Sequence, residues 1–212
     1  MIYSVDIYNE QWKKLKAKEL NDKIFNDENI NQWLIHEFIL MQLANARNPI
    51  AHTKTRWEIN FSWRKLFKQK WTWRARVWDA ASPIRRHWWT AFWPRNIINH
   101  TKSMPKKMRL KALFWALTMK VKDEEILCLN KYSSKQIKTK EAYDMLKNLW
   151  LDNQKVLFVI PSKDELLIKS FRNIDNVKYL IVDYINPNDL LTHKKVLFME
   201  ESLDKLETIF LK

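Results

Sequence analysis

The run VLFVI, residues 156–160, consists of five apolar residues and predicts a short strand that is buried on both faces of a sheet. Further apolar segments of similar length predict strands at Ile126–Leu129, Tyr179–Val182 and Val196–Met199. Amphipathic helices are predicted between and after them, at Thr139–Leu149, Asp164–Ile174, Asn188–Leu191 and Glu201–Leu211. Apolar strands that alternate with amphipathic helices form a parallel sheet covered by helices on both faces. The second half of the chain therefore predicts an α/β fold.

The first half of the chain adds a hairpin and two helices to this sheet. Residues 1–20 alternate between apolar and polar and predict two short strands, with Trp12 at the turn. Helical spacing of apolar residues begins after Asn31, a favourable cap, and has to end before Pro49. A second helical pattern runs from Met108 to Val121. We expect one domain over residues 1–212, with a mainly parallel sheet flanked by helices in a Rossmann-like, three-layer arrangement.

One segment carries the whole net charge of the chain. Between His52 and Lys111 there are sixteen Lys or Arg residues and only two acids, Glu58 and Asp79, which gives +14. The net charge of all 212 residues is also +14, so the remainder of the chain is balanced. Residues 50–103 show no regular periodicity, and we interpret them as an extended basic loop inserted between two helices. Such a segment indicates a polyanionic partner, and its positive charges are spaced to follow RNA phosphates.

Other classes of function find little support in the composition. The single cysteine, Cys128, has no neighbours at metal-site spacing, and we expect it to be a buried residue in a reducing, cytoplasmic compartment. No apolar stretch has the length of a membrane span, and the N-terminus lacks a signal-peptide pattern. We expect no cofactor, because there is no glycine-rich phosphate loop, and no enzyme, because the histidines have no carboxylate or thiol partner at a telling spacing. His193, beside two lysines, is expected at the surface.

The glycine and tryptophan contents are abnormal. The chain contains no glycine and twelve tryptophans. Average usage would give about 15 glycines in a chain of this length. Tight turns need residues that tolerate positive φ, and tryptophan is among the poorer choices for this. The turns of this chain therefore require an explanation for their tryptophans.

Three quoted segments carry a resemblance to a known family. They are KTRWEI at 54–59, RKLFKQKWTWRARVWDAASPIRRHWWTAFWPR at 64–95 and MPKKMRLKALFWAL at 104–117. Together they resemble the large-subunit ribosomal protein L-four family, whose signature reads K-T-R, Q-K-G-T-G-R-A-R, S-P, G-G, F-G-P and P-K-K. The C-terminal half is similar to the family as well, so that the resemblance covers essentially residues 1–212. The departures are of one kind, because tryptophan stands where the family has glycine, at Trp71, Trp73, Trp78, Trp88, Trp89 and Trp93. Our hypothesis is that UGA codons specifying glycine are written as tryptophan.

The resemblance implies a structural protein of the large ribosomal subunit, located on cytoplasmic ribosomes. Its partners would be large-subunit ribosomal RNA and neighbouring ribosomal proteins, with no membrane, metal or small-molecule substrate. It would support subunit assembly, and the tip of its loop would line the nascent-peptide exit tunnel. The tip would comprise Lys70, Trp71, Thr72, Trp73 and Arg74. The expected RNA-binding residues are Lys54, Arg56, Arg64, Lys65, Lys68, Lys70, Arg74, Arg76, Arg85, Arg86, Arg95, Lys106, Lys107 and Arg109.

Two alternatives from other classes remain open on the sequence. Read literally, RRHWWTAFWPR, residues 85–95, is similar to Trp/Arg-rich segments that bind membrane surfaces. The segment has no helical amphipathicity, which disfavours that interpretation. An RNA-processing enzyme on an α/β scaffold is the other alternative, and it lacks an acid/base constellation.

Overall fold

The computed structural model describes residues 3–26, 30–82, 85, 91–134 and 136–211. The chain divides into two units, which we call the α/β unit (residues 1–43 and 103–212) and the basic unit (residues 44–102). The prediction of a single domain with a basic loop inserted at 50–103 stays a prediction.

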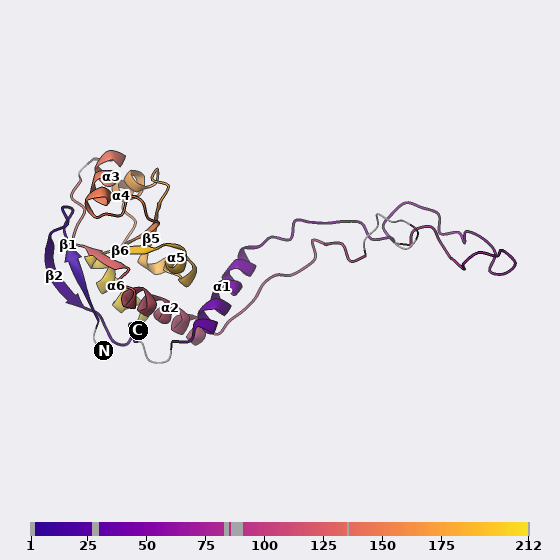
Figure 1. Cartoon of the computed structure of the whole chain (residues 1–212), viewed down its shortest axis with the longest axis horizontal. Coiled ribbons are helices and arrows are strands. Elements are labelled where there is room, and N and C mark those ends of the chain that lie inside the picture. Colours follow the sequence, from indigo (N-terminus) through magenta and orange to yellow (C-terminus); the bar gives the residue numbers. More distant parts are fainter. Residues whose placement is uncertain (1–2, 27–29, 83–84, 86–90, 135, 212) are drawn as a thin grey trace. The chain divides into compact units, whose positions relative to one another are not determined.

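The α/β unit is built on a mostly parallel sheet with helices around it (Figure 1). Its six strands lie in the order β2-β1-β3-β6-β4-β5. The strands are β1 (Ser4–Tyr8), β2 (Lys14–Glu19), β3 (Ile126–Leu129), β4 (Val156–Ile160), β5 (Val177–Ile181) and β6 (Lys195–Met199). Only β2 runs antiparallel to its neighbour, β1, and the other four pairings are parallel. The prediction of an α/β fold with a mainly parallel sheet is confirmed.

Helices cover both faces of the sheet because side chains of the central strands alternate between two apolar clusters. In β4, Leu157 and Val159 belong to one cluster and Phe158 and Ile160 to the other. The first cluster includes residues of α2, α5 and α6, and the second includes residues of α3 and α4. These helices are α2 (Lys106–Lys122), α3 (Thr139–Asn148), α4 (Glu165–Phe171), α5 (Pro187–Thr192) and α6 (Glu200–Phe210). Burial on both faces of the sheet thus explains why the central strands are apolar along their whole length.

The N-terminal elements agree with the sequence pattern. β1 and β2 form the predicted hairpin, with Trp12 in its turn, although residues 1 and 2 lie outside the described part of the chain. Helix α1 (Gln32–Ala46) begins directly after Asn31, whose side-chain oxygen accepts a hydrogen bond from the backbone of Leu34. This is the expected capping contact. The helix ends at Ala46, before Pro49.

Most element boundaries differ from the predictions by about one residue, and the end of α4 and the start of β5 differ by more, both for reasons of tertiary packing. Helix α4 ends at Phe171 and not at Ile174, because Ile174 packs against the second apolar cluster through a turn. Strand β5 begins at Val177, two residues earlier than predicted, because Val177 pairs in register with Val156 of β4. Val182 lies in a short 3₁₀ helix that follows the strand.

The prediction of a surface position for His193 is wrong. Its exposed fraction is 9%, and its Nδ1 lies 2.7 Å from the carbonyl oxygen of Asp189. The two flanking lysines suggested exposure, but the chain enters the buried strand β6 two residues later. Cys128 was expected to be buried and is fully so, and this burial raises the pKa of its thiol to about 12.

The edge strand β2 is held by ion pairs. Lys14 pairs with Asp6 of β1, Lys16 with Glu200 of α6 and Lys18 with Asp204 of α6. Each lysine links the edge strand to a carboxylate of β1 or α6. The strand is therefore attached to the unit by side chains as well as by the β1 ladder.

A buried carboxylate fixes the start of α5. Asp189 accepts hydrogen bonds from Lys178 Nζ at 2.6 Å and from Asn186 Nδ2 at 2.9 Å. Burial alone would raise the pKa of Asp189, but the hydrogen bonds from Lys178 and Asn186 outweigh it and hold the pKa below the usual 3.8. The charged form is therefore the stable one in the folded protein.

The Asp189 contacts should contribute to stability in a pH-dependent way. Because the pKa is lower in the folded than in the unfolded chain, their contribution is complete above about pH 4 and disappears as the pH falls through the folded value. Asp189→Asn should lower the free energy of unfolding by about 1–3 kcal/mol near pH 6, and the deficit should shrink below pH 4. Urea unfolding of both proteins across this range measures it. A deficit independent of pH would contradict the assignment.

Candidate nucleic-acid interface

Side-chain and backbone hydrogen bonds tie the outgoing and returning halves of the basic unit together. Its described residues 47–82, 85 and 91–102 contain no helix or strand (Figure 1). At the base, Asn45 exchanges two hydrogen bonds with the backbone of Lys102, at 2.8 and 3.1 Å. Further along, the Thr53 backbone N–H donates to Pro94 O at 3.2 Å, and the Leu66 N–H donates to Trp78 O at 3.0 Å. The two halves of the chain are thus paired at three levels.

Both acids of the predicted basic segment are engaged within the unit. The carboxylate of Glu58 accepts the Thr55 N–H at 2.9 Å and Arg95 Nη2 at 2.6 Å, and these two contacts lower the pKa of Glu58. Asp79 is buried and accepts the Ala81 N–H at 3.0 Å. The acids fix the conformation of the segment, and only Arg95 among the described cations of this unit forms a salt bridge.

Most predicted RNA-binding residues are exposed. The exposed ones are Lys54, Arg56, Arg64, Lys68, Lys70, Arg74, Arg76, Arg85, Lys106, Lys107 and Arg109. Lys65 and Arg95 are partly buried, because Lys65 bonds to Gln69 Oε1 at 2.6 Å and Arg95 bonds to Glu58. Arg86 lies outside the described residues. Lys106, Lys107 and Arg109 are in the first turns of α2, within the α/β unit, and the others belong to the basic unit.

The predicted tip lies in a closed turn. The hydrogen bond between Leu66 and Trp78 closes a loop, with residues 70–74 near its middle. Trp71 and Trp73 have φ values of 66° and 52°, and their exposed fractions are 92% and 99%. Bulky residues rarely occupy this left-handed region, where glycine is favoured. Two turns of the chain thus place tryptophan in a conformation that suits glycine. Trp88 and Trp89 lie outside the described residues.

The tryptophans of the chain are unusually exposed. The structure describes ten of the twelve, and none of the ten is buried. Nine are exposed, namely Trp12, Trp33, Trp57, Trp63, Trp71, Trp73, Trp78, Trp93 and Trp150. Within the described residues, six non-glycine residues have positive φ, and four of the six are tryptophans. A side chain with this much apolar area is normally well buried.

Among the four tryptophans with positive φ, one was not predicted from the sequence to lie in a turn. Trp150 follows α3 with a φ of 57°, where the Leu151 N–H donates to Leu146 O and the Trp150 N–H donates to Lys147 O. This pair of bonds defines a Schellman motif, whose left-handed residue is usually glycine. The sequence could have indicated this position, because Trp150 stands between a predicted helix and a predicted apolar strand.

Aromatic rings accompany the cations of the basic unit. The guanidinium of Arg56 lies 4.5 Å from the ring centre of Trp57, and the Trp57 and Trp63 rings stack at 4.6 Å. The guanidinium of Arg85 lies 5.9 Å from the Phe67 ring. Aromatic rings and arginine side chains are the groups on which unpaired nucleic-acid bases commonly stack.

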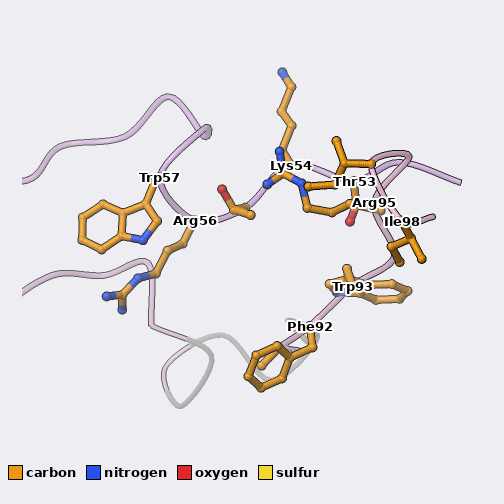
Figure 2. Close-up of a pocket in the computed structure, with 11 residues that line it drawn as sticks. Thr53, Lys54, Arg56, Trp57, Phe92, Trp93, Arg95 and Ile98 are labelled. Carbon is orange, nitrogen blue, oxygen red and sulfur yellow. The ribbon is translucent and has the colours of Figure 1, made fainter.

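A hollow of about 510 Å³ lies where the outgoing and returning halves of the basic unit meet (Figure 2). It is lined by residues 53–57, 91–93, 95, 97 and 98. In Figure 2, Phe92, Trp93 and Ile98 lie along one side, Arg56 and Trp57 along the other, and the Lys54 side chain points away. Sequence reasoning did not find this hollow, because it depends on contacts between segments about forty residues apart.

Two other kinds of site find no support among the described residues. In that part of the chain, no group of three or more His, Cys, Asp or Glu residues is arranged to hold a metal ion. No described helix has the length and apolar character needed to cross a membrane.

Known proteins resemble this chain over nearly its full length. Residues 18–209 match the profile of the Ribosomal protein L4/L1 family. The large ribosomal subunit protein uL4 of Caldicellulosiruptor saccharolyticus is 38% identical over 206 residues, which cover 97% of this chain and 98% of the relative. The protein of the same name from Alkaliphilus metalliredigens is 38% identical with the same coverage. That from Halothermothrix orenii is 37% identical over 90% of each chain. The chain therefore belongs to the Ribosomal protein L4/L1 family.

Proposed function

We propose that this chain is a structural protein of the large ribosomal subunit and that it binds ribosomal RNA through the basic unit. The observation that carries the proposal is its 38% identity, over 97% of its length, with proteins named large ribosomal subunit protein uL4. The exposed cations of the basic unit support it, since each can neutralise a phosphate and release a counterion. Arginines can also fork to a phosphate or stack on a base, whereas lysines act as point charges.

We further propose that the chain acts in subunit assembly and at the exit tunnel. The basic unit reaches between RNA segments and supports their assembly, in contact with neighbouring ribosomal proteins of cytoplasmic ribosomes. Its tip, residues 70–74, lines the nascent-peptide exit tunnel. The closed turn between Leu66 and Trp78 favours this, because it presents two cations, Lys70 and Arg74, at its exposed end.

One experiment tests both levels of the proposal. An affinity-tagged copy, expressed in its own organism, should sediment with large ribosomal subunits and remain bound in moderate salt. A photo-reactive amino acid at Thr72 should cross-link to nascent chains, whereas the same group at Tyr143 of the exposed face of α3 should not. Absence from large subunits would refute the function. Presence with equal cross-linking from both positions would refute only the assignment of the tip.

We infer that the twelve tryptophans are glycines in the native protein, encoded by UGA codons that specify glycine. Four of them adopt positive φ, at two tip positions, a hairpin turn and a helix end, and none of the ten described is buried. Six coincide with glycines of the family signature. All of these features are natural for glycine and costly for tryptophan.

Mass spectrometry of natively purified protein tests the recoding. The intact mass should fall below the 25.9 kDa of the written chain by twelve tryptophan-to-glycine differences. Peptides that contain Trp33 and Trp115 give the strictest test of the inference. These two residues lie inside α1 and α2, where glycine costs about 1 kcal/mol of helix stability at each position. An intact mass of 25.9 kDa would refute the inference.

A further inference from the structure

We propose that the hollow beside Phe92 receives one unpaired nucleobase of the bound RNA, with Phe92 as its stacking platform. The proposal rests on the RNA-binding function proposed above and specifies which RNA feature this part of the basic unit recognises. Its two assigned groups, Phe92 and Arg56, are unchanged by glycine recoding, whereas Trp57 and Trp93 in the lining of the hollow are not.

Phe92 is both exposed and conformationally strained. Its φ is 58° and its exposed fraction is 104%, so no described residue covers its ring. A large aromatic residue in the left-handed region costs free energy, and an uncovered ring contributes no packing in return. Glycine or asparagine would suit the backbone better. An exposed ring held in this manner is typical of a group that contacts a partner.

The surroundings of Phe92 are held in place by direct contacts. The backbone N–H and hydroxyl of Thr53 both donate to Pro94 O, at 3.2 and 3.3 Å. The next residue, Arg95, bonds to Glu58 at 2.6 Å. These contacts fix the segment that carries Phe92 against the segment that carries Arg56. These contacts hold the two segments together at the hollow, whose lining also includes the indole rings of Trp57 and Trp93.

Chemistry favours a base over an apolar protein segment as the occupant. The hollow, of about 510 Å³, lies within the range of small-ligand sites, and Phe92 and Ile98 form an apolar side (Figure 2). Arg56 lies on the opposite side, with its guanidinium 4.5 Å from the ring centre of Trp57 and pointing away from Phe92 (Figure 2). In this position it can bind the phosphate of a nucleotide whose base enters the hollow. Unpaired RNA bases are commonly recognised by stacking on aromatic rings and guanidinium planes. The positive charge around the hollow disfavours a basic protein tail.

The test compares stacking with charge in the full-length chain, in whichever form mass spectrometry finds native. Binding to large-subunit ribosomal RNA from the same organism is measured for the parent, Phe92→Leu, Phe92→Tyr and Arg64→Gln across a range of salt concentrations. Phe92→Leu should weaken binding roughly 5- to 150-fold without changing the salt dependence. Phe92→Tyr should restore affinity. Arg64→Gln, which removes an exposed charge away from the hollow, should reduce the salt slope by about one.

Ultraviolet cross-linking provides the second measurement. Phe92 should join to one nucleotide that is unpaired in the RNA secondary structure. Unchanged affinity for Phe92→Leu would overturn the proposal, as would a cross-link to a paired nucleotide or, on whole subunits, to a protein. Failure of the parent to bind the RNA at all would instead refute the underlying function.

Discussion

Replacing Lys120 with methionine should lower the free energy of unfolding by about 3 kcal/mol. Lys120 lies in α2 with an exposed fraction of 6%, and its ammonium group donates to Glu125 at 2.5 Å and to the carbonyl oxygens of His193 and Lys194 at 2.9 and 3.3 Å. The buried ammonium group of Lys120 is thus the shared donor for three acceptors, which lie in the α2–β3 and α5–β6 connections. Methionine fills the space of the stem but leaves all three without it.

The size of this effect follows from the burial of the partners. Breaking a buried ion pair costs about 3–5 kcal/mol, because the remaining charge is left without compensation. The Glu125 side chain is 20% exposed and can be partly hydrated. We therefore expect the loss of unfolding free energy to lie at the lower end of this range. Urea unfolding followed by circular dichroism measures it. Lys138→Met, at an exposed pair with Glu141, is the matched control and should change stability by less than about 0.5 kcal/mol. Equal stabilities of the two variants would contradict this account.

Neutralising five exposed cations of the basic unit should reduce affinity for large-subunit ribosomal RNA by a factor on the order of 10³, at about 1 kcal/mol for each phosphate that is no longer neutralised. The five changes, each to glutamine, are at Arg56, Arg64, Lys68, Arg74 and Arg76. The slope of the logarithm of the binding constant against the logarithm of salt concentration should fall by about 0.7–0.9 for each of these phosphates. Stability should hardly change, because these side chains are exposed.

The control for this experiment carries the same charge change elsewhere. Five exposed lysines of the α/β unit, Lys131, Lys140, Lys147, Lys163 and Lys169, are replaced by glutamine. Their removal lowers the net charge equally, so it reports the effect of overall charge alone. If affinity falls equally in the two variants, the basic unit is not the RNA-binding part of the chain.

Local patterns predicted the secondary structure well where burial is symmetrical. The bounds of β3 and β4 match the predictions because their residues are apolar throughout and the flanking residues are polar or, after β4, a proline. The position of β6 between β3 and β4 could not be predicted, because strand order depends on long-range pairing. The burial of His193 was missed for a similar reason. Its neighbours in sequence are lysines, but its neighbours in space are the ends of α5 and α2.

The cations of the candidate interface could be predicted from the sequence, whereas the contacts that shape it could not. The cations could be identified by counting, since a net charge of +14 in one segment is visible without a structure. The contacts between Asn45 and Lys102 and between Thr53 and Pro94 join residues 57 and 41 positions apart, which no local pattern specifies. Phe92 was visible only as part of a signature. Its positive φ and complete exposure are what distinguish it from a packing residue.

The lysines of the sheet edges have a consequence for the chain before it meets RNA. Strand β2 alternates Lys14, Lys16 and Lys18 with other residues, and β5, at the opposite edge, has Lys178 near its centre. Lysines on an edge strand disfavour the addition of a further strand, because the incoming strand would have to pack beside charged groups that are already held in ion pairs. We therefore expect free copies of the protein to resist association through the edges of their sheets. Under the proposed function, lysine would serve the chain twice, by attracting RNA and by limiting this association.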